Sequence, residues 1–223
     1  MTDILLYLII IILSFISSIL SYLYLCSRNK DTKLLKNLLK IDYDKKKLIF
    51  SVGILFLSVF IFIYSYKLAG NTILKAFMNA QVIIWIYTVA YIDLIERIIP
   101  NQLIFVGIIF WIILLALEVL IAKTPIKQIL LYSLVGGLIC GGVLFAIAII
   151  VRNALGMGDV KMFTVLGLLY GLTNTYSILL YSVVIMAIVS IVLLMAKKVT
   201  RKTAVPMAPF VAVGLLLHFL LEM

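Results

Sequence analysis

Two aspartates beside apolar segments are the residues of this sequence best suited to chemistry. Asp93 lies in "YIDLIERIIPN" and Asp159 lies in "GMGDVK". An ionisable side chain in or beside a membrane-spanning segment is energetically expensive, and it therefore indicates a function. Two neighbouring carboxylates cannot both ionise cheaply, so one keeps a proton that it can donate while the other can take a proton from water. This division of roles is typical of aspartic peptidase chemistry.

The other acidic residues are weaker candidates because their positions have simpler explanations. They lie in a polar loop, near the termini or near a helix end that can reach water: Asp3, Asp31, Asp42, Asp44, Glu118 and Glu222. Glu96 lies one turn beyond Asp93. Asp93 and Asp159 are far apart along the chain, so only tertiary packing can bring them together. The sequence thus predicts a carboxylate pair whose geometry depends on how its helices pack.

Composition defines the elements that must position this pair. Of the 223 residues, 65% are hydrophobic and 13% are charged, whereas a soluble domain is about half apolar and about a quarter charged. Apolar runs of about 20 residues predict membrane-spanning helices, and the alternation expected of a barrel is absent from the sequence. We therefore expect an all-α, polytopic membrane helical bundle. Cys26 and Cys140 lack the spacing of a zinc site or a disulfide framework, so no metal or other cofactor is expected.

About eight transmembrane helices are expected. Their approximate limits are 4–26, 49–68, 74–93, 102–122, 128–150, 160–173, 176–196 and 205–222. The sixth segment has about 14 residues, or about 21 Å of helix, which is short for a hydrocarbon core of about 30 Å. The pairs Gly137/Gly141 and Gly167/Gly171 are typical of helices that approach each other closely. We expect two regions, namely residues 1–48 with the first helix and a basic loop, and residues 49–223 as a membrane-embedded domain carrying both aspartates.

Lysine and arginine counts predict the orientation of the chain. With the basic loop at 27–48 in the cytoplasm, fifteen of the 19 basic residues fall on the cytoplasmic side and four outside. Both termini are then outside, and both aspartates lie at cytoplasmic helix ends. The net charge of +10 follows the loops rather than a folded basic domain. We therefore expect anionic lipid headgroups as partners, and not nucleic acid.

The glycines around Asp159 favour access by an extended peptide. Gly156 and Gly158 allow close approach of another backbone, and we expect both to interrupt the helix. The simpler alternative is an interhelical turn in which Asp159 caps the next helix. Met157 either lines a substrate groove or fills core space. Lys161 is two residues beyond Asp159, so it points away and is a candidate for an interfacial anchor or a substrate contact.

At these motifs the sequence resembles the type IV prepilin peptidases, which are GxGD-type membrane aspartic peptidases. The resemblance rests on "YIDLIERIIPNQL" at 91–103, "GMGDVKMFTVLGLLYG" at 156–171 and "AVPMAPFVAVG" at 204–214. It covers roughly residues 80–215. It implies that Asp93 and Asp159 are the catalytic pair of an endopeptidase in the cytoplasmic membrane of a bacterium or archaeon. The implied substrates are prepilins or pseudopilins, cut at the cytoplasmic face just before their apolar helix.

One departure from the family pattern concerns methylation. Bifunctional members carry two CxxC pairs in the first cytoplasmic loop and also methylate the new N-terminus. Residues 27–48 contain no cysteine. The resemblance therefore implies leader peptidase activity without N-methyltransferase activity.

Two rival interpretations remain at this stage. A presenilin-like or signal-peptide-peptidase-like protease also uses GxGD, but here Ile92 separates the tyrosine from Asp93, and the last motif reads "PMAP". A proton-coupled transporter can use paired intramembrane acids as a relay, although the repeats typical of transporters are absent from the sequence. The site of cleavage separates the two proteases, and loss of cleavage on Asp159→Asn separates a peptidase from a transporter. The sequence carries no indication of oligomeric state.

Overall fold

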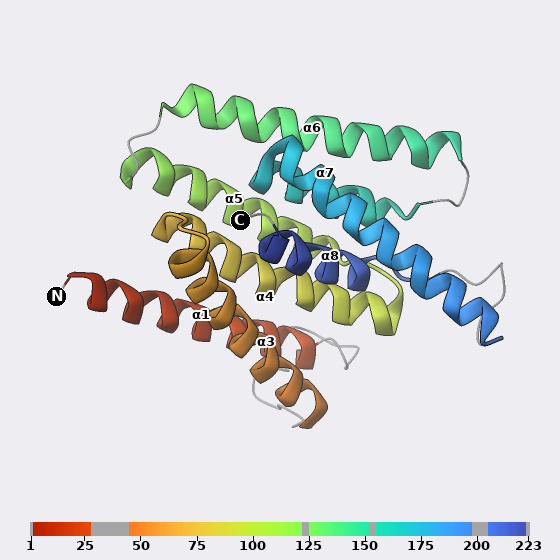
Figure 1. Ribbon diagram of the computed structural model, residues 1–223, viewed down its shortest axis with the longest axis horizontal. Coiled ribbons are helices and arrows are strands. Elements are labelled where there is room, and N and C mark those ends of the chain that lie inside the picture. The colour runs from red at the N-terminus through yellow and green to blue at the C-terminus, as the bar shows by residue number, and fades with distance from the viewer. Residues whose placement is uncertain (1, 28–44, 122–124, 152–154, 198–204, 222–223) are drawn as a thin grey trace. The chain divides into compact units, whose positions relative to one another are not determined.

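The computed structural model describes residues 2–27, 45–121, 125–151, 155–197 and 205–221. Every regular element in these ranges is a helix, which confirms the all-α class. The elements (Figure 1) are α1 (Thr2–Ser27), α3 (Lys45–Ile63) with its π-helical continuation η1 (Tyr64–Leu68), α4 (Ile73–Glu96), α5 (Asn101–Ile121), α6 (Ile126–Ile150), α7 (Met157–Met195) and α8 (Ala208–Leu221). Most of the predicted basic loop lies outside the described residues.

Several of these helices are long and apolar enough to cross a bilayer. By length and composition, five described segments qualify: Lys45–Leu68, Ile73–Glu96, Asn101–Ile121, Ile126–Ile150 and Met157–Met195. The segment Ile12–Ser27 of α1 and the whole of α8 are apolar but shorter. The expected polytopic membrane helical bundle is therefore confirmed.

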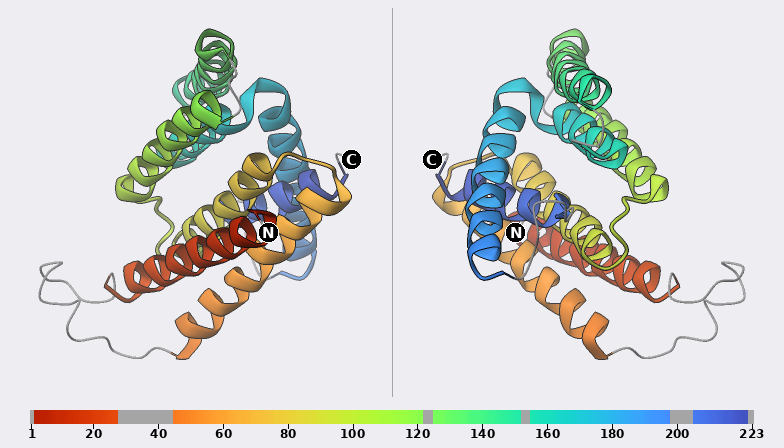
Figure 2. Two further views of the ribbon diagram at one scale, coloured as in Figure 1. Left: turned by 90° about the vertical axis from the view of Figure 1, so that its left-hand side faces the viewer. Right: turned by 90° about the vertical axis from the view of Figure 1, so that its right-hand side faces the viewer.

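A break at Gly171 divides α7 into two arms. Gly171 has φ 71° and ψ −175°, a conformation that is essentially restricted to glycine. The chain changes direction there (Figure 2). The two helices predicted at 160–173 and 176–196 correspond to these arms, but the prediction of a short loop between them is wrong, because a single glycine makes the junction. The first arm also begins three residues earlier than predicted, at Met157.

Side chains satisfy the backbone carbonyls near this break. The Tyr132 hydroxyl donates a hydrogen bond to the carbonyl oxygen of Tyr170 at 2.7 Å. Thr175 Oγ1 donates to the carbonyl oxygen of Leu166 at 3.1 Å. Because a membrane offers no water to unpaired carbonyls, a helix break within it requires such donors.

The chain forms two compact units, Met1–Thr88 and Val89–Met223. In the first unit, polar side chains join helices across their buried faces. The hydroxyls of Ser21 and Thr88 lie 2.6 Å apart, and Gln81 Nε2 donates to Ser14 Oγ at 3.1 Å. Such hydrogen bonds hold membrane helices together where hydrophobic burial alone does not.

A buried lysine in the first unit leads to a testable prediction. Lys47 is 4% exposed, and its Nζ donates to the carbonyl oxygen of Leu25, near the end of α1, at 2.8 Å. Lys47→Met removes this donor and the positive charge at the negative end of the helix. We expect the free energy of unfolding to fall by about 1–2 kcal/mol, measured by unfolding in detergent. The control is Lys45→Met, since Lys45 is exposed, and equal effects of the two changes would contradict the capping role of Lys47.

In the second unit, α6 and α7 approach each other at glycines. Gly136, Gly137 and Gly141 of α6 are buried, and a Cβ at Gly136 would overlap backbone atoms of Gly167 and Gly171. The two helices lie side by side in both figures. The prediction that Gly137/Gly141 and Gly167/Gly171 mark a close helix approach is confirmed. Gly136, which is outside both predicted glycine pairs, belongs to the same contact.

Candidate active site

Asp93 lies in the last turn of α4 rather than at its end as predicted. The helix continues to Glu96 and is closed by Arg97, whose φ is 53° and whose N–H donates to the Asp93 carbonyl oxygen at 2.9 Å. A residue in the left-handed region with this backbone bond is a common helix stop. The Asp93 side chain is only 6% exposed, so its carboxylate requires hydrogen-bond donors from the protein.

The N-terminus of α8 supplies these donors. Asp93 Oδ2 accepts a hydrogen bond from the Ala208 backbone N–H at 3.0 Å, and the Met207 N–H donates to the same carboxylate. The first turn of a helix has N–H groups without helical partners, and it carries the positive end of the helix dipole. Pro206 and Pro209 flank this pair of donors and have no N–H of their own,. The prolines thus leave two donors at the helix start, and both bind Asp93.

Asp159 occupies the third position of α7. Gly156 is the N-cap, with φ −73° and ψ 139°, and Met157 is the first helical residue. The Gly156 N–H hydrogen-bonds the Asp159 carboxylate, which is the reaching-back half of a capping box. The alternative in which Asp159 itself caps the helix is therefore wrong. The expectation that both glycines interrupt the helix is also wrong for Gly158, which lies inside the first turn.

The connection between α4 and α5 packs against this first turn. A Cβ on Gly158 would lie 2.9 Å from Ile99 Cβ, so glycine is required there for close contact rather than for a break. Lys161 Nζ donates to Asn101 Oδ1 at 2.9 Å, which holds the ammonium group in a contact with α5. Gly156 and Met157 are exposed, the latter by 51%. The roles of these residues in substrate access or contact remain predictions.

The structure brings the two aspartates together. The end of α4 carries Asp93, the start of α7 carries Asp159, and the start of α8 binds Asp93 through Ala208. The negative charge of Asp93 acts on the Asp159 carboxylate, so the two groups are close enough to repel each other when both are ionised. A pair of this kind shares one proton near neutral pH. It can therefore provide an acid and a base at one place.

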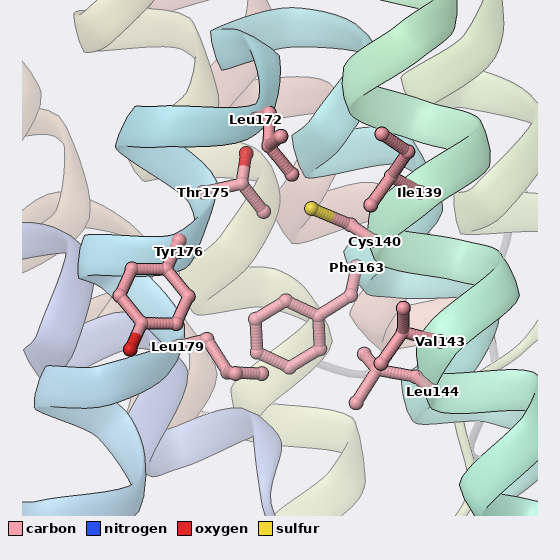
Figure 3. A pocket seen from close by; sticks show the side chains of 9 residues that line it. All are labelled: Ile139, Cys140, Val143, Leu144, Phe163, Leu172, Thr175, Tyr176 and Leu179. Atoms are coloured by element: carbon pink, nitrogen blue, oxygen red, sulfur yellow. The ribbon is translucent and has the colours of Figure 1, made fainter.

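An apolar recess lies next to the first arm of α7 (Figure 3). It has a volume of about 120 Å³ and lies between α6 and the two arms of α7. Phe163, four residues beyond Asp159 and on the same helix face, points into it. Its lining residues are Ile139, Cys140, Val143, Leu144, Phe163, Leu172, Thr175, Tyr176 and Leu179. The recess is suited to hydrocarbon groups, and its lining contains no carboxylate.

Possible metal ligands do not gather in the described part of the chain. No group of three His, Cys, Asp or Glu side chains there could hold a metal ion. Cys26 and Cys140 are free thiols.

Comparison with known proteins adds one finding. A family model described as the type IV leader peptidase family matches residues 80–191. This range is half of the chain, and it includes Asp93, Asp159 and the glycines of the α6–α7 contact. No match was found among curated proteins or among solved structures.

Proposed function

The chain belongs to the type IV leader peptidase family, and from this we propose that it removes the leader peptide of prepilins or pilin-like proteins by aspartic chemistry at the cytoplasmic face of the membrane. One observation carries the proposal. Asp93 and Asp159, which are remote in sequence, meet where α4 ends and α7 begins, within electrostatic range of each other. Among the described residues, neither Asp93 nor Asp159 has a salt-bridge partner that would explain its position.

The pair supplies the two proton transfers that peptide hydrolysis requires. The ionised carboxylate takes a proton from a water molecule, whose oxygen attacks the carbonyl carbon of the scissile bond. The protonated carboxyl donates to the carbonyl oxygen as it gains negative charge. When the C–N bond breaks, one carboxyl group gives its proton to the leaving nitrogen while the other carboxylate takes a proton from a hydroxyl of the tetrahedral intermediate, so the pair is again singly protonated.

The surroundings of the pair suit a substrate that enters from the cytoplasmic edge. Gly156 and Met157 are exposed beside Asp159, so an extended peptide can approach the chain there. Lys161 is exposed one turn from these residues and is suited to an interfacial or substrate contact. In the other unit of the chain, Lys45 and Lys46 at the start of α3 are exposed, and they are suited to attract anionic lipid headgroups. We place the protein in the cytoplasmic membrane of a bacterium or archaeon, with its active site facing the cytoplasm.

The test is cleavage of defined substrates by the purified protein in liposomes. We expect a panel of prepilins and pseudopilins to include substrates cut just before the apolar helix, and mass spectrometry to show a free N-terminus even with S-adenosylmethionine present. Cleavage within the apolar helix would favour the presenilin-like alternative. An N-methylated product made by this protein alone would contradict the absence of methyltransferase activity, and a panel left intact would contradict the proposed function.

A further inference from the structure

We propose that the N-terminus of α8 holds Asp93 as the ionised member of the pair, so that Asp93 activates water and Asp159 carries the proton for the scissile bond. This inference rests on the proposed function and assigns the two roles that the chemistry leaves open. Met207 and Ala208 are positioning residues in this account, since they act through Asp93 and through backbone atoms only.

The contact between Asp93 and α8 is buried and specific. Asp93 is 6% exposed, Met207 7% and Ala208 0%, so water does not compete freely for the carboxylate. The Ala208 N–H lies 3.0 Å from Asp93 Oδ2, and the Met207 N–H donates to the same group. N–H donors bind a carboxylate more strongly than a carboxylic acid, so they favour the charged form of Asp93.

Asp159 receives less support for a negative charge. One backbone amide, that of Gly156, hydrogen-bonds its carboxylate, against two for Asp93. The dipole of α7 favours a charge on Asp159, and the C-terminal end of α4 disfavours one on Asp93. These dipole effects are smaller than a hydrogen bond to a charged group. Burial disfavours a charge on both carboxylates, so we assign the charge to Asp93, the carboxylate that has the second amide. Because the two groups repel each other, the remaining proton stays on Asp159.

The neighbouring charged groups do not alter this balance. Lys161 Nζ is held by Asn101, and the first residues of α5, Asn101 and Gln102, are neutral. Glu96, the last residue of α4, and Arg97, which follows it, are exposed. His218 is ten residues along α8 from Ala208, or about 15 Å of helix,. Asp93 is thus the charged group that acts on Asp159.

The decisive experiment replaces one amide by an ester. Incorporating lactic acid in place of Ala208 exchanges its N–H for an oxygen and keeps the methyl side chain. The matched control is the same replacement of Ala212, a buried alanine of the same helix. Loss of the donor makes the Asp93 carboxylate bind a proton more readily. We expect the acidic limb of the kcat/KM profile to move to higher pH by about one unit or more, with no such shift for Ala212.

A second pair of variants makes the same comparison with natural residues. Ala208→Pro removes the N–H at a helix start, where proline is tolerated, whereas Ala208→Gly keeps the N–H. We expect the acidic limb to move for Ala208→Pro and not for Ala208→Gly. Two results would overturn the inference: an acidic limb that does not shift in the folded ester variant at Ala208, or an equal shift in the ester variant at Ala212. In either case the protein still cleaves its substrate, so the proposed function stands.

A labelling readout does not depend on cleavage. A hydrophobic carbodiimide reacts with protonated carboxyl groups, and peptide mass spectrometry locates the modified residue. In the unaltered protein at neutral pH we expect modification of Asp159. Modification of Asp93 in its place would overturn the inference, whether or not the amide variants fold.

Discussion

Asp159→Asn and Asp93→Asn are each expected to reduce cleavage of a prepilin by about 10³-fold or more. The asparagine side chain keeps the size of aspartate, and at position 93 its carbonyl oxygen can still accept the Ala208 N–H. The fold should therefore survive while proton transfer is lost. Initial rates in liposomes measure the effect, and circular dichroism and unfolding in detergent verify the fold.

The controls for this prediction distinguish catalysis from a general effect of charge. Glu96→Gln removes an exposed carboxylate from the same end of α4 and should leave the rate within about twofold. Because the two aspartates act as a unit, the double variant should be no slower than the slower single variant. Cleavage retained by either single variant would refute the aspartic mechanism.

Gly136→Ala is expected to lower the free energy of unfolding by about 1–3 kcal/mol. The added Cβ would overlap the backbone of Gly167 and Gly171, and backbone atoms cannot move aside as a side chain can. The helices α6 and α7 must then separate, which weakens the support of the helix that carries Asp159. The unfolding of the purified protein in detergent, followed by fluorescence, measures the loss.

The matched control lies on the same helix. Gly142 is exposed, and a Cβ there meets no atom within 4 Å. Gly142→Ala therefore gains helix propensity without a clash and should be neutral or stabilising by up to about 1 kcal/mol. The two substitutions are chemically identical, so a difference in the sign of their effects isolates packing. A similar effect at both positions would show that the α6–α7 contact is not tight at Gly136.

The helices were predictable because apolar runs of this length have few alternatives in a bilayer. A helix satisfies its own backbone hydrogen bonds, so the sequence alone predicts where each span must lie. The prediction was wrong at α7, where a loop was expected between 173 and 176 and a single glycine makes the turn instead. Gly167 and Gly171 look alike in sequence, yet one packs within the helix and the other breaks it. The two positions differ in their neighbours: Gly167 faces Gly136 and Gly137, whereas Gly171 faces Tyr132, which donates to the Tyr170 carbonyl oxygen.

Around Asp159, local sequence was informative about residue types but not about their geometry. The sequence predicts that the glycines at 156 and 158 both interrupt the helix. The structure makes Gly156 the N-cap and places Gly158 inside the helix against Ile99. The contact with Ile99 joins segments about 60 residues apart, so no local pattern could reveal it. Prolines such as Pro206 and Pro209 favour a helix start, but they do not indicate what that start binds.

The sequence by itself determined a polytopic helical membrane protein with two costly carboxylates at helix ends. Apolar runs and the acids beside them can be recognised without a structure, and an acid in such a place is expensive enough to indicate a function. Only the tertiary structure decided that α4, α7 and α8 converge, that the Ala208 and Met207 amides bind Asp93, and that Asp159 lies within reach of its charge. Electrostatic and hydrogen-bond energies depend on distances of a few ångströms between segments remote in sequence. Those distances depend on close packing at residues such as Gly136 and Gly158. The neighbours that require glycine at these positions are remote in sequence, so only the tertiary structure identifies them.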